Sequence, residues 1–219
     1  MLSFFINGSE GNIETVHDTF KNSRQDIVSV ICHPHPLYQG SMHNKVVTTL
    51  ARAMKTHNVE SFRFNYRGVG SSHGTYGEGV GELEDLLAVC EWIKNNTSFK
   101  KIILCGFSFG GAIAYTALSK LDNVISLITI APAVDRFDLT KNQEPQNNIP
   151  WLVVQGTDDD TVNPASVFDF VINKVESELV LVKMNEVGHF FHGKLIMLKK
   201  VTENFIGPVI NEIYEDKKG

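Results

Sequence analysis

The chain has 219 residues, of which 42% are hydrophobic and 21% are charged, and its formal net charge is -5. This composition excludes a disordered chain, and the acidic balance argues against a general nucleic-acid binder, which would need a basic face. No apolar run reaches the roughly 18 residues of a membrane span, and the first residues lack the basic start of a secretory signal. We therefore expect one cytoplasmic domain over residues 1–219, with neither nucleic acid nor membrane as a partner.

The predicted elements begin with a β-hairpin, whose strands lie at residues 3–6 and 13–17 on either side of an Asn/Gly-rich turn. After it, short apolar runs predict strands, and stretches with apolar residues every three to four positions predict helices. In chain order these are a strand at 27–32, a helix at 43–55, a strand at 61–64, a helix at 80–94, a strand at 101–105, a helix at 109–119, strands at 124–130 and 151–155, a helix at 165–174, a strand at 179–184 and a helix from about 193.

The last helix has a predicted apolar face and a predicted break. Leu195, Leu198, Val201 and Phe205 recur at helical spacing and should be buried. The pair Gly207-Pro208 follows, and proline lacks the amide hydrogen that a helix interior requires. We expect the helix to be kinked or interrupted there.

Strands that alternate with helices predict an α/β fold, a doubly wound and mostly parallel sheet with helices on both faces. Ligands of such sheets bind beyond the carboxyl ends of the strands, so the loops there are where a site is expected. The three cysteines, Cys32, Cys90 and Cys105, form no C-x-x-C pair. They are predicted to be small buried residues in a reducing compartment.

A candidate nucleophile follows the strand at 101–105. The chain reads Gly106-Phe107-Ser108-Phe109-Gly110, a G-x-S-x-G motif between a predicted strand and a predicted helix. Such a turn strains the backbone at the serine, and the glycines remove side chains that would collide. By chance alone the motif is common, and a turn without chemistry is the alternative. The strand-to-helix context favours Ser108 as a nucleophile.

A serine nucleophile needs a histidine base and a carboxylate that orients it, in the chain order serine, acid, histidine. Only His189 and His192 lie downstream of Ser108, and His189 stands in the loop that returns to the carboxyl edge of the sheet. We take His189 as the base, with His192 as the alternative. The acid should follow the strand at 151–155, where Asp158, Asp159 and Asp160 stand in a row, and composition does not choose among them. A solvated or cation-binding turn is the alternative interpretation of this run.

Acyl transfer also needs amides that bind the oxyanion. One should be the backbone N–H of Phe109, directly after the nucleophile. The other should come from the loop His33-Pro34-His35-Pro36-Leu37, in which the prolines cannot donate. That leaves His35 or Leu37, and we take His35 as the candidate.

Two other kinds of site are disfavoured. His33 and His35, with His43 nearby, could suggest a metal pair, but the stretch supplies no further ligands at close spacing. His33 is more simply a residue that braces its loop. The sequence from Gly68 has His73 in place of the third glycine of G-x-G-x-x-G, and no phosphate-binding P-loop occurs. We expect no metal and no cofactor.

Taken together, several stretches resemble the α/β-hydrolase superfamily, in particular the small, lid-poor bacterial serine hydrolases related to dienelactone hydrolases and prolyl-oligopeptidase-like enzymes. The resemblance places the acid three residues after Gly156, which selects Asp159, and places the histidine at His189. The family's proline seven positions after that glycine is Asn163 here, with Pro164 next, so Asp158 and Asp160 stay open. The matching stretches are residues 33–42, 62–72, 106–111, 155–159 and 188–193.

Only a short segment separates the strands at 124–130 and 151–155, where lipases often insert a helical cap. We therefore expect a minimal cap or none, and an open pocket with Phe109 and four further residues as apolar walls. The predicted function is hydrolysis of small carboxylic esters or thioesters, with a small acyl compound as partner. A peptidase, an acyltransferase and a non-catalytic binding protein are the alternatives, and a homodimer stays open. The four further pocket residues are Leu37, Tyr38, Phe107 and Phe190.

Overall fold

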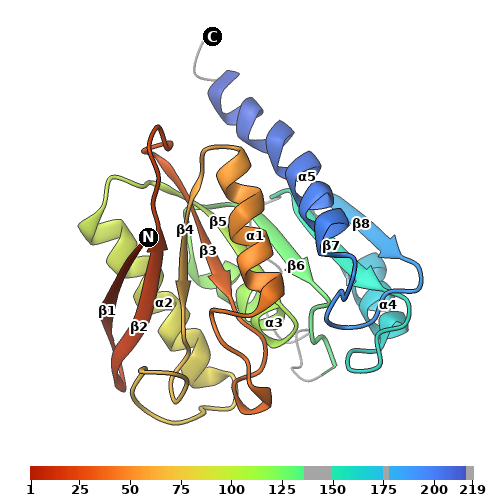
Figure 1. The fold of residues 1–219 in the computed structure, drawn as a ribbon, viewed down its shortest axis with the longest axis horizontal. Helices are drawn as coiled ribbons and strands as arrows, with labels where there is room; N and C mark the ends of the chain where they lie inside the picture. The colour runs from red at the N-terminus through yellow and green to blue at the C-terminus, as the bar shows by residue number, and fades with distance from the viewer. Residues whose placement is uncertain (136–148, 175–177, 216–219) are drawn as a thin grey trace.

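The computed structural model describes residues 1–135, 149–174 and 178–215. Its strands form one eight-stranded sheet in the order β1-β2-β4-β3-β5-β6-β7-β8 (Figure 1). The strands are β1 (Leu2–Gly8), β2 (Gly11–Asp18), β3 (Ile27–Cys32), β4 (Glu60–Phe64), β5 (Lys101–Phe107), β6 (Val124–Ile130), β7 (Trp151–Gly156) and β8 (Leu179–Met184). The helices are α1 (Lys45–Thr56), α2 (Val80–Asn96), α3 (Phe109–Ala117), α4 (Pro164–Lys174) and α5 (Leu195–Glu215), with short 3-10 turns η1 (Pro36–Tyr38) and η2 (Leu118–Lys120).

The sheet is mostly parallel, as predicted. From β4 through β3, β5, β6, β7 and β8 every neighbouring pair of strands is parallel. The predicted hairpin forms the antiparallel pair β1 and β2, and β2 pairs antiparallel with β4. The carboxyl ends of the six parallel strands therefore meet at one edge, where the sequence motifs lie.

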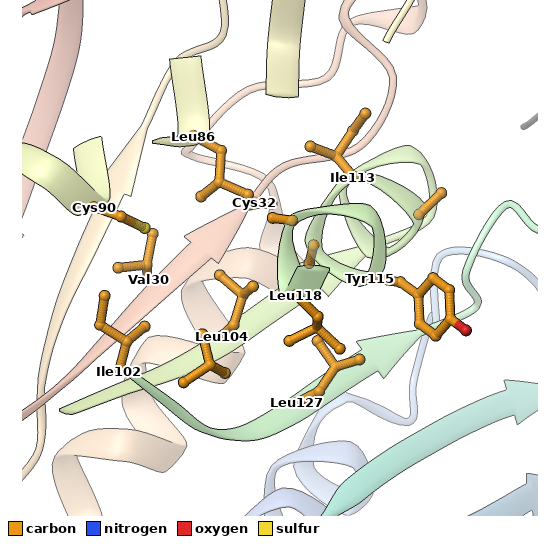
Figure 2. Packing of buried hydrophobic residues seen from close by; sticks show 14 of the residues in the cluster. Val30, Cys32, Leu86, Cys90, Ile102, Leu104, Ile113, Tyr115, Leu118 and Leu127 are labelled. Atoms are coloured by element: carbon orange, nitrogen blue, oxygen red, sulfur yellow. The ribbon is translucent and has the colours of Figure 1, made fainter. Parts of the chain in front are cut away.

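Helices cover both faces of the sheet and enclose two hydrophobic clusters. Helices α1 and α5 lie side by side on one face, in front of the sheet in Figure 1, and α2, α3 and α4 cover the other. Side chains of a strand alternate between faces, so β5 contributes Ile102 and Leu104 to one cluster and Ile103, Cys105 and Phe107 to the other. Figure 2 shows the first cluster, between β5 and helices α2 and α3. This double-sided burial holds the central strand that carries the serine turn.

All three cysteines are free and buried, as the sequence predicts. Cys32 and Cys90 belong to the cluster of Figure 2, and Cys105 lies on the opposite face of β5. Burial raises the pKa of the Cys32 thiol to about 12, and raises those of Cys90 and Cys105 as well, because the apolar surroundings disfavour a thiolate.

Helix α5 is continuous through Gly207-Pro208, where the sequence predicts a kink or an interruption. It is not interrupted at Pro208, which sits inside the helix with its ring exposed. The missing amide removes one helical hydrogen bond, and the burial of the apolar side chains on either side of Pro208 offsets that cost. Of the four residues predicted to be buried, only Leu198 is fully so, and Leu195, Val201 and Phe205 are partly buried. The other buried apolar positions are Ile206, Val209 and Ile210.

The segment that joins β6 to β7, where we expected a minimal cap or none, spans residues 131–150, and its positions 136–148 lie outside the described residues. Among the helices that the structure describes, none has the length and apolarity to cross a membrane.

Candidate active site

Ser108 stands on the turn between β5 and α3 in a strained backbone conformation. Its φ of 55° and ψ of -118° lie in a region of backbone conformation that residues other than glycine rarely adopt. Hydrogen bonds hold it there, because its amide donates to the carbonyl of Ile130 at 2.8 Å and its carbonyl accepts from the amides of Gly111 at 2.9 Å and Ala133 at 3.1 Å. The backbone of β5, α3 and the segment after β6 thus fixes the direction of the hydroxyl.

The two glycines of the motif allow close packing of backbone around the serine. A Cβ atom on Gly106 would lie 2.2 Å from the carbonyl oxygen of Gly110. One on Gly110 would lie 2.5 Å from the carbonyl oxygens of both Cys32 and His33. Because these are backbone atoms, they cannot move aside cheaply, so the first turn of α3 sits directly against the end of β3.

The structure brings Ser108, His189 and Asp159 together in one hydrogen-bonded chain. The Oγ of Ser108 lies 3.0 Å from Nε2 of His189, and Nδ1 of His189 lies 2.8 Å from Oδ2 of Asp159. The three residues are 6%, 4% and 7% exposed, although 81 residues separate the serine from the histidine. The parallel topology explains the meeting, since each residue follows the carboxyl end of its own strand, β5, β7 or β8.

Asp159 is the one carboxylate of the aspartate run that contacts the histidine. Its Oδ1 accepts from the amides of Thr161 at 2.9 Å and Val162 at 2.8 Å. Burial alone would raise its pKa, but the hydrogen bonds from His189 and from these two amides outweigh burial, and the pKa is lowered. Asp158 and Asp160 are exposed, and their side chains bond to neighbouring threonine hydroxyls instead.

Gln155 is a site residue that the sequence analysis missed. Its Nε2 donates to Oδ2 of Asp159 at 3.0 Å, and the side chain is fully buried. The signal in the sequence was a polar residue near the end of the otherwise apolar strand β7. A polar side chain that is buried there requires a hydrogen-bond partner. His192, the alternative base, is exposed, and neither the Ser108 hydroxyl nor the Asp159 carboxylate has a hydrogen bond to it among the described residues.

The loop after β3 is braced by His33, as the sequence suggests. This buried side chain contacts the carbonyl of Pro34 through Nδ1 at 2.6 Å and accepts from the amide of Tyr66 through Nε2 at 3.0 Å. Burial lowers its pKa to about 3, so the ring is neutral and holds its loop against the end of β4.

The amide of Leu37 donates to Nδ1 of His35 at 3.2 Å, so it is directed back into its own loop rather than toward Ser108. The His35 ring lies against Phe109, with 4.9 Å between ring centroids, and its Nε2 is 3.2 Å from the hydroxyl of Tyr76. His35 and Phe109 both line the cavity at the serine. Of the two loop residues considered, this favours His35 as the donor.

A cavity of about 620 Å³ opens at Ser108. Tyr38, Phe109 and Phe190 line it as predicted, but Leu37 and Phe107 do not. Leu37 points to solvent from η1 and is 66% exposed, while Phe107 faces the α1/α5 side of β5 and packs under the His189 ring. The remaining lining residues are Pro34, His35, Gln39, Asn44, Ala133, Asp160, Thr161, Val162 and His189.

No group of three or more histidine, cysteine or acidic side chains in the described residues is arranged to hold a metal ion. Besides Ser108 and His189, the cavity is lined by the polar side chains of Gln39, Asn44, Asp160 and Thr161.

Comparisons with known proteins agree with this geometry. The profile of a family described as serine aminopeptidase, S33, matches residues 40–139. An α/β serine hydrolase homologue from Coxiella burnetii is 40% identical over 93% of this chain and 96% of its own, with a TM-score of 0.86. A structure from Xanthomonas campestris, described as an α/β serine hydrolase without lid, is 36% identical over 94% of both chains, with a TM-score of 0.87.

Curated relatives match over the whole chain or part of it. An uncharacterized protein of Rickettsia prowazekii is 31% identical over 99% of this chain and 96% of its own. Shorter stretches match an acyl-protein thioesterase homologue of Dictyostelium discoideum, 39% identical over 33% of this chain and 34% of that protein, and a mitochondrial palmitoyl-protein thioesterase of Rattus norvegicus, 34% identical over 46% of this chain and 33% of that protein. With a mostly parallel eight-stranded sheet and full-length relatives described as serine hydrolases, the chain belongs to the α/β-hydrolase superfamily.

Proposed function

We propose that the protein is a serine hydrolase that cleaves small carboxylic esters or thioesters through an acyl-enzyme on Ser108. The observation that carries the proposal is the chain of hydrogen bonds from the Ser108 hydroxyl through His189 to Asp159. A serine hydroxyl is a weak nucleophile, and this arrangement supplies both the base and the group that orients it.

In this mechanism His189 Nε2 takes the proton as the Ser108 oxygen bonds to the substrate carbonyl carbon. Asp159 keeps the imidazole in the tautomer with its proton on Nδ1 and stabilises the imidazolium that forms. The carbonyl oxygen becomes an oxyanion, which the backbone amides of Phe109 and His35 are suited to bind, each such donor being worth about 3 kcal/mol.

Collapse of this first tetrahedral intermediate breaks the bond to the leaving oxygen or sulfur, which receives the proton from His189. Water then adds to the acyl-enzyme with the same base, and the second intermediate releases the carboxylic acid and restores the Ser108 hydroxyl. The reaction consumes the ester or thioester and one water molecule, and it needs no other cosubstrate.

The choice of esters and thioesters has two supports. Tyr38, Phe109, Val162 and Phe190 give the cavity an apolar wall suited to a short acyl chain. Two relatives that match part of the chain are named as thioesterases. The family profile named for a serine aminopeptidase favours a peptidase as the second candidate, because the same triad would serve both reactions.

The test combines labelling with a substrate panel. A fluorophosphonate probe should label the wild-type protein at neutral pH and leave Ser108→Ala unlabelled, while Asp158→Asn, at an exposed residue outside the cavity lining, labels like the wild type. Acyl p-nitrophenyl esters and S-acyl thioesters of increasing chain length should be hydrolysed with kcat/KM values well above those for aminoacyl p-nitroanilides. A wild-type protein that resists the probe would refute the proposal, and faster cleavage of the anilides would favour the peptidase.

A further inference from the structure

A second cavity adjoins the one at Ser108. It has a volume of about 400 Å³, and two of its lining residues, Asn44 and Phe190, also line the first cavity. Phe190 is 48% exposed and stands at the boundary between them. A substrate that enters at Ser108 can therefore extend past Phe190 into the second cavity.

The second cavity is basic, although the whole chain carries a net charge of -5. Three of its lining residues, His43, Lys45 and His192, are exposed nitrogen donors, and no acidic side chain lines it. Within the described part of the chain, none of the three takes part in an ion pair. The remaining lining residues are Ser41, Asn44 and Phe190.

Lys45 occupies a position where a cation is unfavourable for the fold. It is the first residue of α1, and the amino end of a helix carries partial positive charge that favours anions. The first turn of α1 holds no acidic residue that would compensate. Asn44 caps the helix by accepting from the amide of Val46 at 2.8 Å, which leaves its Nδ2 as the side-chain donor. The Lys45 ammonium group, the Asn44 side-chain amide and the amino end of α1 all favour a bound anion at this place.

The catalytic geometry tells which part of a substrate reaches this cavity. In the proposed mechanism His189 hands its proton to the leaving atom, so the alcohol or thiol part must lie beside His189. Phe190 and His192 belong to the same loop as His189 and form part of the second cavity. The leaving group, rather than the acyl chain, is directed toward it.

We propose that the natural substrate is an ester or thioester whose alcohol or thiol part carries a carboxylate or phosphate. This anionic group binds to Lys45, His43 and His192 in the second cavity. The inference rests on the proposed function.

Matched thioesters test the proposal. The butyryl thioester of 3-mercaptopropionate carries a carboxylate, that of 3-mercaptopropionamide is its neutral counterpart, and that of 2-mercaptoethyl phosphate provides the phosphate. Thiol release is followed with a disulfide reagent. We expect wild-type kcat/KM to be about tenfold or more higher for at least one anionic thioester than for the neutral one. The larger of the two preferences tells carboxylate from phosphate.

Variants of the cavity should remove this preference without affecting the chemistry. Lys45→Gln should lower kcat/KM for the preferred anionic thioester about five- to tenfold, and the triple variant with His43→Ala and His192→Ala should abolish the preference. Both should hydrolyse the neutral thioester within about twofold of wild type. Because Lys45 opposes the helix dipole, Lys45→Gln should keep or raise the Tm, which separates lost binding from lost folding. The control Lys100→Gln removes the same charge before β5, at the opposite edge of the sheet, and should retain the preference.

The outcomes distinguish the two proposals. If the neutral thioester is cleaved in a Ser108-dependent way but neither anionic thioester is preferred, or the preference survives in the triple variant, the basic cavity is not a substrate site and the hydrolase proposal stands. If no thioester or ester is cleaved and the fluorophosphonate does not react, the proposed function itself fails. Raising the salt concentration should shrink the anionic preference and leave the neutral rate unchanged.

Discussion

One carboxylate oxygen, Oδ2 of Asp159, accepts hydrogen bonds from two side chains, Nδ1 of His189 at 2.8 Å and Nε2 of Gln155 at 3.0 Å. The other oxygen is held by backbone amides, so the carboxylate has no freedom to rotate. Gln155 comes from β7, part of the rigid sheet, and does not line the cavity. It therefore fixes the acid without touching a substrate.

Gln155→Leu should lower kcat about tenfold and leave KM unchanged, because the carboxylate loses the donor that orients it while the cavity stays intact. Steady-state kinetics on one short ester would measure both constants. Gln155→Glu, which keeps the shape but sets a second carboxyl beside Asp159, should be no better than leucine. A rise in KM with unchanged kcat would contradict this role.

Asp159→Asn should reduce kcat about 10³- to 10⁴-fold, since an amide can stabilise the wrong tautomer of the histidine. Asp158→Asn and Asp160→Asn are matched controls and should change kcat by less than about threefold, because neither carboxylate reaches His189. Parallel kinetics of the three variants would show which aspartate is the acid. Equal losses at positions 158 and 159 would argue for a rearranged loop.

Gly110→Ala should destabilise the fold by about 3 kcal/mol and abolish the activity of the molecules that still fold. Its Cβ would lie 2.5 Å from two carbonyl oxygens at the end of β3 and would push α3 away from the loop of His35. Gly111→Ala is the matched control, because the Cβ that it adds would lie 3.2 Å from its nearest neighbours, the Cα and Cβ atoms of Pro132. Chemical denaturation should show a loss below about 1 kcal/mol for Gly111→Ala, where helix propensity offsets the contact.

Stability should fall on acidification from about pH 6.5 toward pH 3, in part through His33. An unfolded chain protonates this histidine near its ordinary pKa, whereas burial lowers the pKa in the folded protein to about 3. Between these values the unfolded state binds a proton that the folded state does not, which costs on the order of 5 kcal/mol across the window. His33→Gln keeps a donor for Pro34 and an acceptor for Tyr66. Its free energy of unfolding should depend less steeply on pH, and an identical slope would refute the assignment.

Much of the fold could be predicted from the sequence, because the hydrophobic pattern of a strand and the backbone constraints of a turn are local properties of the chain. The strands β3, β6 and β8 have the predicted bounds. The near-continuous apolar runs of β3 and β6 are buried on both faces, as in the interior of a parallel sheet. The chain order of serine, acid and histidine, with G-x-S-x-G between strand and helix, was enough to name Ser108 and His189, which the structure brings together. It narrowed the acid only to three adjacent aspartates, and the family resemblance selected Asp159, the one that contacts the histidine.

What the sequence could not reveal depends on side-chain direction. Phe107 and Phe109 flank Ser108 symmetrically in the sequence, yet the strand pleat sends Phe107 to the α1/α5 core, while the first turn of α3 places Phe109 at the cavity. Leu37 follows the braced loop but points outward. The role of Gln155 could not be predicted without knowing that its side chain on β7 reaches Asp159 in the following loop. The basic cavity could not be predicted without knowing that the start of α1 lies beside the loop of His189. Such relationships arise only when the chain folds.

The burial of the three sulfur atoms has a practical outcome for enzymology and for the cell. Because burial raises their pKa values and leaves them at most 3% exposed, these thiols are poor targets for alkylation, mixed-disulfide exchange or peroxide. A colorimetric disulfide reagent can therefore report released product without inactivating the catalyst. The protein should also keep its activity when oxidative stress disables enzymes that depend on a reactive cysteine.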